Sequence, residues 1–147
     1  MTQEDKQLLL KDICARLPYG VKCKIHYTLN NETTFGEDVD AEKNDTLVKI
    51  DIHTQSAYFD WYCDWLSIED IRPYLRPMSS MTEEEQKEFV KFHCVNICPI
   101  VLTDMLTLGN ESKMFDWLNA HHFDYRGLIE KGLAIEAHKD MYNTKTE

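Results

Sequence analysis

Residues 21–29 alternate strictly between apolar and polar side chains, and this pattern constrains the fold more than any other part of the chain. The apolar set is Val21, Cys23, Ile25, Tyr27 and Leu29, and the polar set is Lys22, Lys24, His26 and Thr28. Successive side chains of a strand point to opposite faces, so the pattern predicts a strand with one buried face and one face in water. Such a strand favours an antiparallel sheet that is covered by helices on one face.

Strand patterns recur in three later segments. Residues 47–53 and 57–63 are separated by a short polar link and are predicted to form a hairpin, and residues 133–137 alternate in the same way. The stretch before them, "NNETTFGEDVDAEKND", is polar and acidic, and we interpret it as a long loop.

Two capping boxes predict where helices begin. Thr2 with Asp5, and Thr82 with Glu85, have the spacing at which each side chain bonds the other residue's free backbone amide. After Thr2, apolar residues recur at helical spacing and predict a first helix.

Three further segments carry helix signals of other kinds. Ser67 predicts a short helix that ends near Pro73, and Asn110 predicts the start of a helix that carries Trp117. The segment "VNICPIVLTDMLTLG" is apolar, and it fits a buried helix or a buried strand.

The order of these elements predicts an α+β fold. We expect a small antiparallel sheet of three to four strands with helices packed on one face. A chain of 147 residues suits one domain, placed at residues 1–137, followed by a polar C-terminal tail at residues 138–147.

The net charge of −10 limits the partners of the protein. An acidic surface repels phosphate backbones, so direct binding of nucleic acid is disfavoured. The longest uninterrupted apolar run, "ICPIVL", is too short to cross a membrane, and the acidic N-terminal segment does not resemble a signal peptide. The five scattered cysteines make a poor disulfide framework. These features predict a cytoplasmic protein.

The segment "NAHHFDYRGLIEKG" places two histidines, an aspartate, a tyrosine, an arginine and a glutamate within fourteen residues. One hypothesis is a hydrolase-like site, whose catalytic candidates are His121, His122, Asp124, Tyr125 and Arg126. The alternative is a structural corner between two helices, in which Asp124 caps the second, short helix. The structural alternative predicts an exposed His122 and a buried set, which is Trp117, Leu118, Phe123, Leu128 and Ile129.

Two other groups are weaker candidates. His93, Cys94 and Cys98 could begin a zinc site, but no second Cys/His pair accompanies them. Aromatic residues gather in "YFDWYCDWL", either as core or as a binding platform, and the binding candidates are Tyr58, Trp61, Tyr62 and Trp65. The sequence carries no nucleotide-binding or hydrolase motif, so no cofactor is predicted.

Two segments, "IEDIRPYLRPMSSMTEEE" and "WLNAHHFDYRGLIEKGLAIEA", resemble a family of uncharacterised small proteins. This family is found in gut anaerobic bacteria and in their phages and mobile elements. The resemblance covers roughly the second half of the chain, except residues 95–108. It implies a bacterial or phage accessory protein and brings no catalytic residue or ligand with it.

These observations favour a non-enzymatic module that binds another protein. The small hydrolase is the alternative, and an acidic inhibitor that mimics DNA is a third hypothesis. The sequence leaves open whether the chain forms a homo-oligomer.

Overall fold

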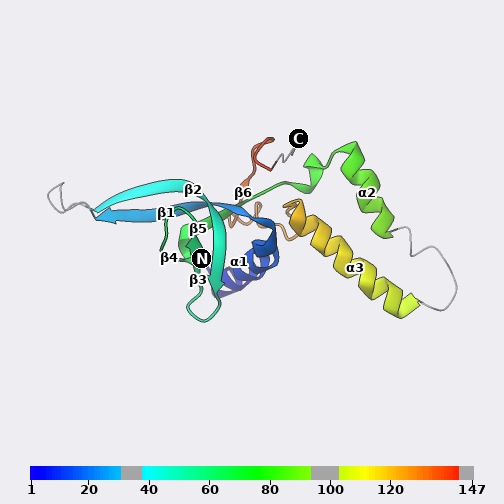
Figure 1. Cartoon of the computed structure of the whole chain (residues 1–147), viewed down its shortest axis with the longest axis horizontal. Helices are drawn as coiled ribbons and strands as arrows, with labels where there is room; N and C mark the ends of the chain where they lie inside the picture. The colour runs from blue at the N-terminus through cyan, green and yellow to red at the C-terminus, as the bar shows by residue number, and fades with distance from the viewer. Residues whose placement is uncertain (31–37, 94–102, 143–147) are drawn as a thin grey trace.

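A computed structural model describes residues 1–30, 38–93 and 103–142 (Figure 1). Its centre is a six-stranded sheet in the order β4-β3-β2-β1-β5-β6. The strands are β1 (Lys22–Asn30), β2 (Asp38–Asp51), β3 (Ser56–Phe59), β4 (Trp65–Ser67), β5 (Ile71–Leu75) and β6 (Ile135–Glu136). The α-helices of the described residues are α1 (Gln3–Arg16), α2 (Glu83–His93) and α3 (Thr103–Ala120). The fold is α+β, but the predicted sheet of three to four antiparallel strands is wrong, because the sheet has six strands and β6 pairs with β5 in parallel.

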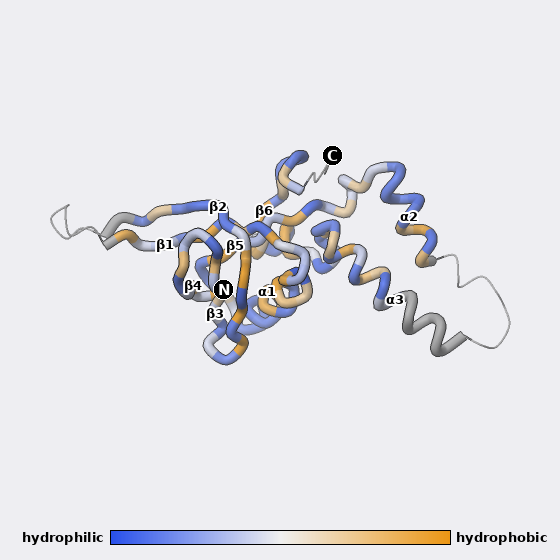
Figure 2. The backbone as a smooth tube through the Cα atoms, in the orientation of Figure 1, coloured by the Kyte–Doolittle hydropathy of each residue, from blue (hydrophilic) through white to orange (hydrophobic). Residues whose placement is uncertain are grey.

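The largest difference lies in β2, which begins inside the stretch that was predicted to be a loop. Its first half pairs with β1 over the full length of that strand, from Lys22 opposite Thr46 to Asn30 opposite Asp38. The two strands extend from the body as an arm, and β2 is largely hydrophilic along it (Figure 2). Because little core lies beneath the arm, β2 does not need to alternate between apolar and polar residues there. The ladder and an ion pair between Lys24 and Glu42 hold it instead.

The strand β5 was also missed, because Pro73 was interpreted as the end of a helix. Ser67 does cap a helical turn, but this turn is the short 3-10 segment Ile68–Asp70, and the chain then enters β5 directly. Pro73 pairs with Cys23 of β1. β6 pairs only with Tyr74 and Leu75, so the missing amide of Pro73 leaves no gap in that ladder.

The core lies where α1 packs against the sheet. Both predicted capping boxes are confirmed: the amide of Asp5 donates to Thr2 Oγ1 at 3.1 Å, and the amide of Glu85 donates to Thr82 Oγ1 at 3.2 Å. The fully buried apolar residues include Leu9, Ile13, Val21, Cys23, Ile25, Ala57, Phe59, Ile71, Leu75 and Leu128.

Only part of the helical prediction holds for the second half of the chain. α2 and α3 form a pair that leans away from the sheet instead of covering one of its faces (Figure 1). Asn110 lies inside α3 and does not begin it. α3 ends at Ala120 and contacts α1, and the candidate corner begins after Ala120.

Candidate functional site

The corner after α3 holds its polar side chains in separate places. The ring of His121 stacks on Trp117 with centroids 4.1 Å apart, and its Nδ1 donates to the Trp117 carbonyl oxygen at 2.9 Å. The hydroxyl of Tyr125 donates to Asn119 Oδ1 at 3.0 Å. Both side chains are thereby tied to α3.

Asp124 binds backbone amides, as the structural hypothesis expects, but it does not cap a helix. Its two carboxylate oxygens accept hydrogen bonds from the amides of Leu128 and Ile129, each at 2.9 Å. The segment that follows is a series of turns, and the predicted second short helix is wrong. Gly127, which lies inside the predicted helix, has a φ of 73°, which a continuous helix does not allow.

Arg126 belongs to a buried ion cluster. Asp12 and Arg16, one turn apart on α1, are both fully buried, and Arg16 Nε donates to Asp12 Oδ2 at 2.7 Å. Arg126 Nη1 donates to the other oxygen of Asp12 at 2.8 Å, and Arg16 Nη2 donates to the carbonyl oxygen of Phe123 at 2.8 Å. The cluster joins the first helix to the corner. Two guanidinium groups share one carboxylate, so the net charge of the cluster is positive.

His122 is buried, with 4% of its surface exposed, and the expectation that it is exposed is wrong. Its backbone is left-handed at φ 59°, and its ring stacks on Tyr142 with centroids 3.8 Å apart. Tyr142 lies in the predicted tail, where its hydroxyl donates to the Tyr74 carbonyl oxygen at 2.8 Å and accepts from the Lys22 amide at 3.0 Å. Burial, followed by the nearby charges of Arg16 and other cations, lowers the pKa of His122 to about 3.

This buried histidine predicts sensitivity to acid. In the unfolded chain His122 takes up a proton near its ordinary pKa of 6.5, whereas in the folded protein it does so only near 3. Its contribution to stability is therefore complete above pH 6.5 and is lost as the pH falls from 6.5 toward 3. We expect His122→Gln to reduce the difference in unfolding free energy between about pH 7 and about pH 5, measured by urea denaturation. His138→Gln, at an exposed histidine, should keep the wild-type difference, and an unchanged difference in His122→Gln would contradict the argument.

The buried set of the corner is mostly as predicted. Leu118, Phe123 and Leu128 are at most 2% exposed, while Trp117 and Ile129 are half-buried.

The five catalytic candidates do not meet in one cleft. His121 and His122 line a cavity of about 400 Å³, and Asp124, Tyr125 and Arg126 are absent from its walls. The hydrolase hypothesis requires these side chains to converge, and the geometry of the described residues does not provide that convergence.

The metal candidates fall largely outside the described structure. Cys94 and Cys98 lie beyond it, and only the backbone of His93 is described. Within the described ranges, no group of three or more His, Cys, Asp or Glu side chains is placed to hold a metal ion.

The predicted aromatic platform is divided into two groups. Tyr58 lies between the buried residues Ala57 and Phe59 of β3, so it points away from the core, where it packs against Trp65 at 5.7 Å between centroids. The second group lies beside the core at the base of the arm. There Tyr27 contacts Tyr62 at 5.0 Å and Trp61 at 6.0 Å between centroids. We call the residues Tyr27, Trp61 and Tyr62 the arm-base surface.

The arm-base surface combines an exposed tryptophan with a cavity. Trp61 is 53% exposed, and the ammonium of Lys43 lies 3.1 Å from the centre of its ring. A cavity of about 550 Å³ adjoins it. The cavity is lined by His26, Tyr27, Thr28, Asp40, Tyr62, Leu66, Glu69 and Asp70. Glu69 is paired with Lys6, which leaves Asp40 and Asp70 as the carboxylates without an ion pair to any described residue.

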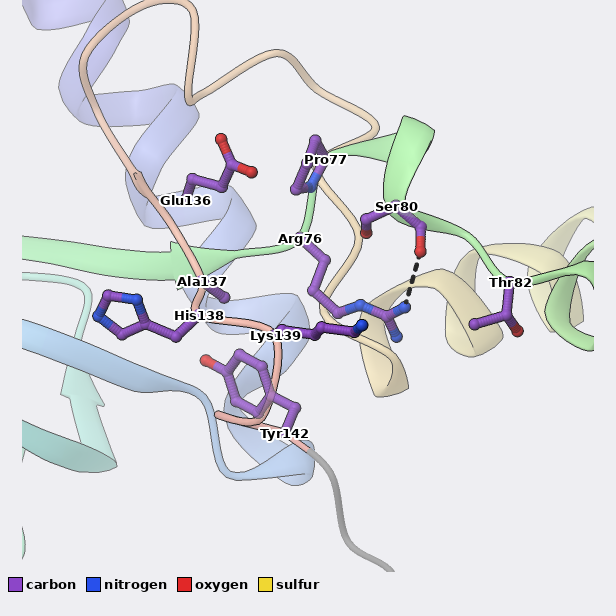
Figure 3. Close-up of a pocket in the computed structure, with 9 residues that line it drawn as sticks. All are labelled: Arg76, Pro77, Ser80, Thr82, Glu136, Ala137, His138, Lys139 and Tyr142. Atoms are coloured by element: carbon purple, nitrogen blue, oxygen red, sulfur yellow. Dashed lines mark hydrogen bonds between the residues drawn. The ribbon is translucent and has the colours of Figure 1, made fainter.

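A further cavity, of about 450 Å³, lies between β5, the residues that precede α2, and the segment after β6 (Figure 3). Its central side chain is Arg76, which makes two hydrogen bonds to Glu85 at 2.8 and 2.9 Å and one to the Ser80 carbonyl oxygen at 3.3 Å. The hydrogen bonds from Arg76 hold the pKa of Glu85 at about 2. The Arg76 guanidinium also lies 4.3 Å from the centre of the Phe123 ring.

Sequence reasoning missed Asp12, Arg16, Arg76 and Tyr142. The signal for the first two was present, because a carboxylate and a guanidinium one turn apart flank the apolar stripe of the first helix. Arg76 and Tyr142 carry no local signal, since their partners are distant in sequence.

No family model, curated protein or solved structure matches the chain. In the part of the chain that the structure describes, no helix has the length and apolar character to span a membrane.

Proposed function

We propose that the protein is a non-enzymatic cytoplasmic module that binds another protein through the arm-base surface. The observation that carries this proposal is the half-exposed Trp61, whose ring is held by Tyr27 and Lys43 beside a cavity. Tryptophan and tyrosine are the side chains that most often dominate the binding energy of protein interfaces. A link to phage or mobile-element biology rests on the resemblance alone.

The chemistry of the surface also defines the partner. The rings of Tyr27 and Tyr62 present apolar faces, and Asp40 and Asp70 add negative charge at the adjoining cavity. The chain as a whole carries a net charge of −10. An apolar contact with basic residues at its rim is complementary to this surface, so we propose a partner that is basic at the contact.

The test compares two tryptophans of similar exposure. Trp61 is 53% exposed and Trp65 is 46% exposed, but Trp65 lies with Tyr58 on the outer face of the sheet. The partner is identified by crosslinking in cells that express the protein, and its affinity is then measured with purified components. Trp61→Ala should weaken binding by about thirtyfold, as loss of an interface hot spot does. Trp65→Ala should stay within about twofold of the wild type, because it removes equal surface elsewhere.

Two outcomes contradict the proposal. Equal weakening by both substitutions would mean that the arm-base surface is not specific. Unchanged affinity of Trp61→Ala would place the contact elsewhere on the molecule. Circular dichroism of both variants establishes that they fold as the wild type does.

A further inference from the structure

Two cavities meet at Arg76 and Tyr142. The first is the cavity of about 450 Å³ in Figure 3, and the second is the cavity of about 400 Å³ that His121 and His122 line. Both have Arg76 and Tyr142 in their walls. We call this pair of neighbouring spaces, which share two wall residues, the Arg76 cavity.

Cationic side chains are prominent around the Arg76 cavity, in a chain that is acidic overall. Lys139 lines the first space and Lys22 the second. Figure 3 shows the side chains of Arg76 and Lys139 extending toward the same part of the cavity. Glu136 also lines this space, with its carboxylate directed away from the two cations. Glu85 neutralises Arg76. Lys139 makes no ion pair with the residues that the structure describes.

The surroundings add to the positive charge. The ammonium of Lys22 donates to the Met141 carbonyl oxygen at 3.0 Å, a contact that leaves its charge uncompensated. The positive charge of Arg16 also reaches the cavity, because it helps to lower the pKa of His122 in the cavity wall. An anion in the cavity would therefore meet a favourable field.

His122 lies in the wall of the second space and is sensitive to charge in it. It is 4% exposed, it lines the second space, and its Nδ1 has no hydrogen-bond partner among the described residues. This nitrogen is itself closed off from the cavity, so a ligand there acts on the His122 ring through its charge and not through a hydrogen bond.

We propose that the Arg76 cavity binds a small organic ligand through an oxyanion group, either a phosphate or a carboxylate. Lys139 and Arg76 hold the oxyanion, and the hydroxyl groups of Ser80 and Thr82 line the same space. The first space alone has the volume of a small-molecule site, so the ligand is larger than a bare ion. This site shares no residue with the arm-base surface.

The experiment titrates the folded protein with two probes, inorganic phosphate and citrate, at constant ionic strength set with sodium chloride. Binding is followed by NMR shifts of backbone amides around Arg76 and Tyr142. We expect saturable binding of at least one probe, and the stronger probe identifies the oxyanion. Lys139→Gln should weaken that binding by about tenfold, the effect of losing one charge-assisted contact. Lys131→Gln removes an exposed lysine on the turn after Gly127 and should leave the affinity unchanged.

A second readout follows the ring of His122. An anion beside Arg76 offsets the positive charges that oppose protonation, so a saturating probe should raise the pKa of His122. A linear response to both probes without saturation would overturn the proposal. So would equal affinities of Lys139→Gln and Lys131→Gln, or a His122 titration that does not move.

Discussion

Replacing Asp12 with alanine should lower the free energy of unfolding by about 3–5 kcal/mol, because it leaves a buried guanidinium without its counter-charge. Arg16 is fully buried, and Asp12 supplies two of its hydrogen bonds, at 2.7 and 3.0 Å. Arg126 loses its partner in the same substitution. Urea denaturation at neutral pH measures the loss, and the slope of the transition shows whether the folded state is retained.

A matched double variant separates the charge effect from the loss of packing. Asp12→Leu combined with Arg16→Met fills the same space with apolar groups and leaves no cation of α1 buried. Replacements of this kind are often neutral or stabilising, so the double variant should be more stable than Asp12→Ala by about 3 kcal/mol or more. A loss below about 1 kcal/mol in Asp12→Ala would show that water reaches Arg16.

Replacing Phe123 with alanine should cost a similar amount, about 3–5 kcal/mol. Its ring is fully buried, stacks on Trp117 with centroids 5.7 Å apart, and carries the guanidinium of Arg76 on one face. Phe115→Ala is the control, because this residue of α3 is 42% exposed. We expect it to cost about 1 kcal/mol or less. Equal losses in thermal unfolding would mean that the corner is not part of the cooperative core.

The sequence predicted the elements whose residue pattern depends on burial or on capping by near neighbours in the chain. β1 alternates because Cys23 and Ile25 face the core, and α1 begins at a capping box that needs only four neighbouring residues. β2 could not be predicted in this way. Its first half owes its conformation to pairing with β1, and the strand carries polar residues on both faces where the arm leaves the body. β5 was not predicted for a related reason. Pro73 fits in this strand because β6 pairs only with Tyr74 and Leu75, and that pairing is not visible in the local sequence.

The candidate sites were predictable to different degrees. The bonds from backbone amides to Asp124 follow from local chemistry and were expected, although the helix they were expected to cap is absent. Trp61 was among the aromatic binding candidates. Trp61 and Trp65 belong to separate groups because their rings lie in different places relative to the sheet. The sequence between them has no regular alternation from which these positions could be predicted. The Arg76 cavity combines residues from β1, the segment after β5, the corner and the segment after β6, so no single stretch of sequence predicts it.

The contacts between the first helix and the corner also determine when the chain can fold during its synthesis. Arg16 bonds a carbonyl oxygen that lies 107 residues later, and the amide of Lys22 bonds a hydroxyl that lies 120 residues later. As the chain emerges from the ribosome, Asp12 is already beside Arg16, but the Phe123 carbonyl oxygen and the corner that cover Arg16 are made about a hundred residues later. Structure that depends on long sequence separations forms slowly and leaves apolar surface open in the meantime. The early apolar segments therefore remain accessible to chaperones for most of translation, and the native core closes as a late event.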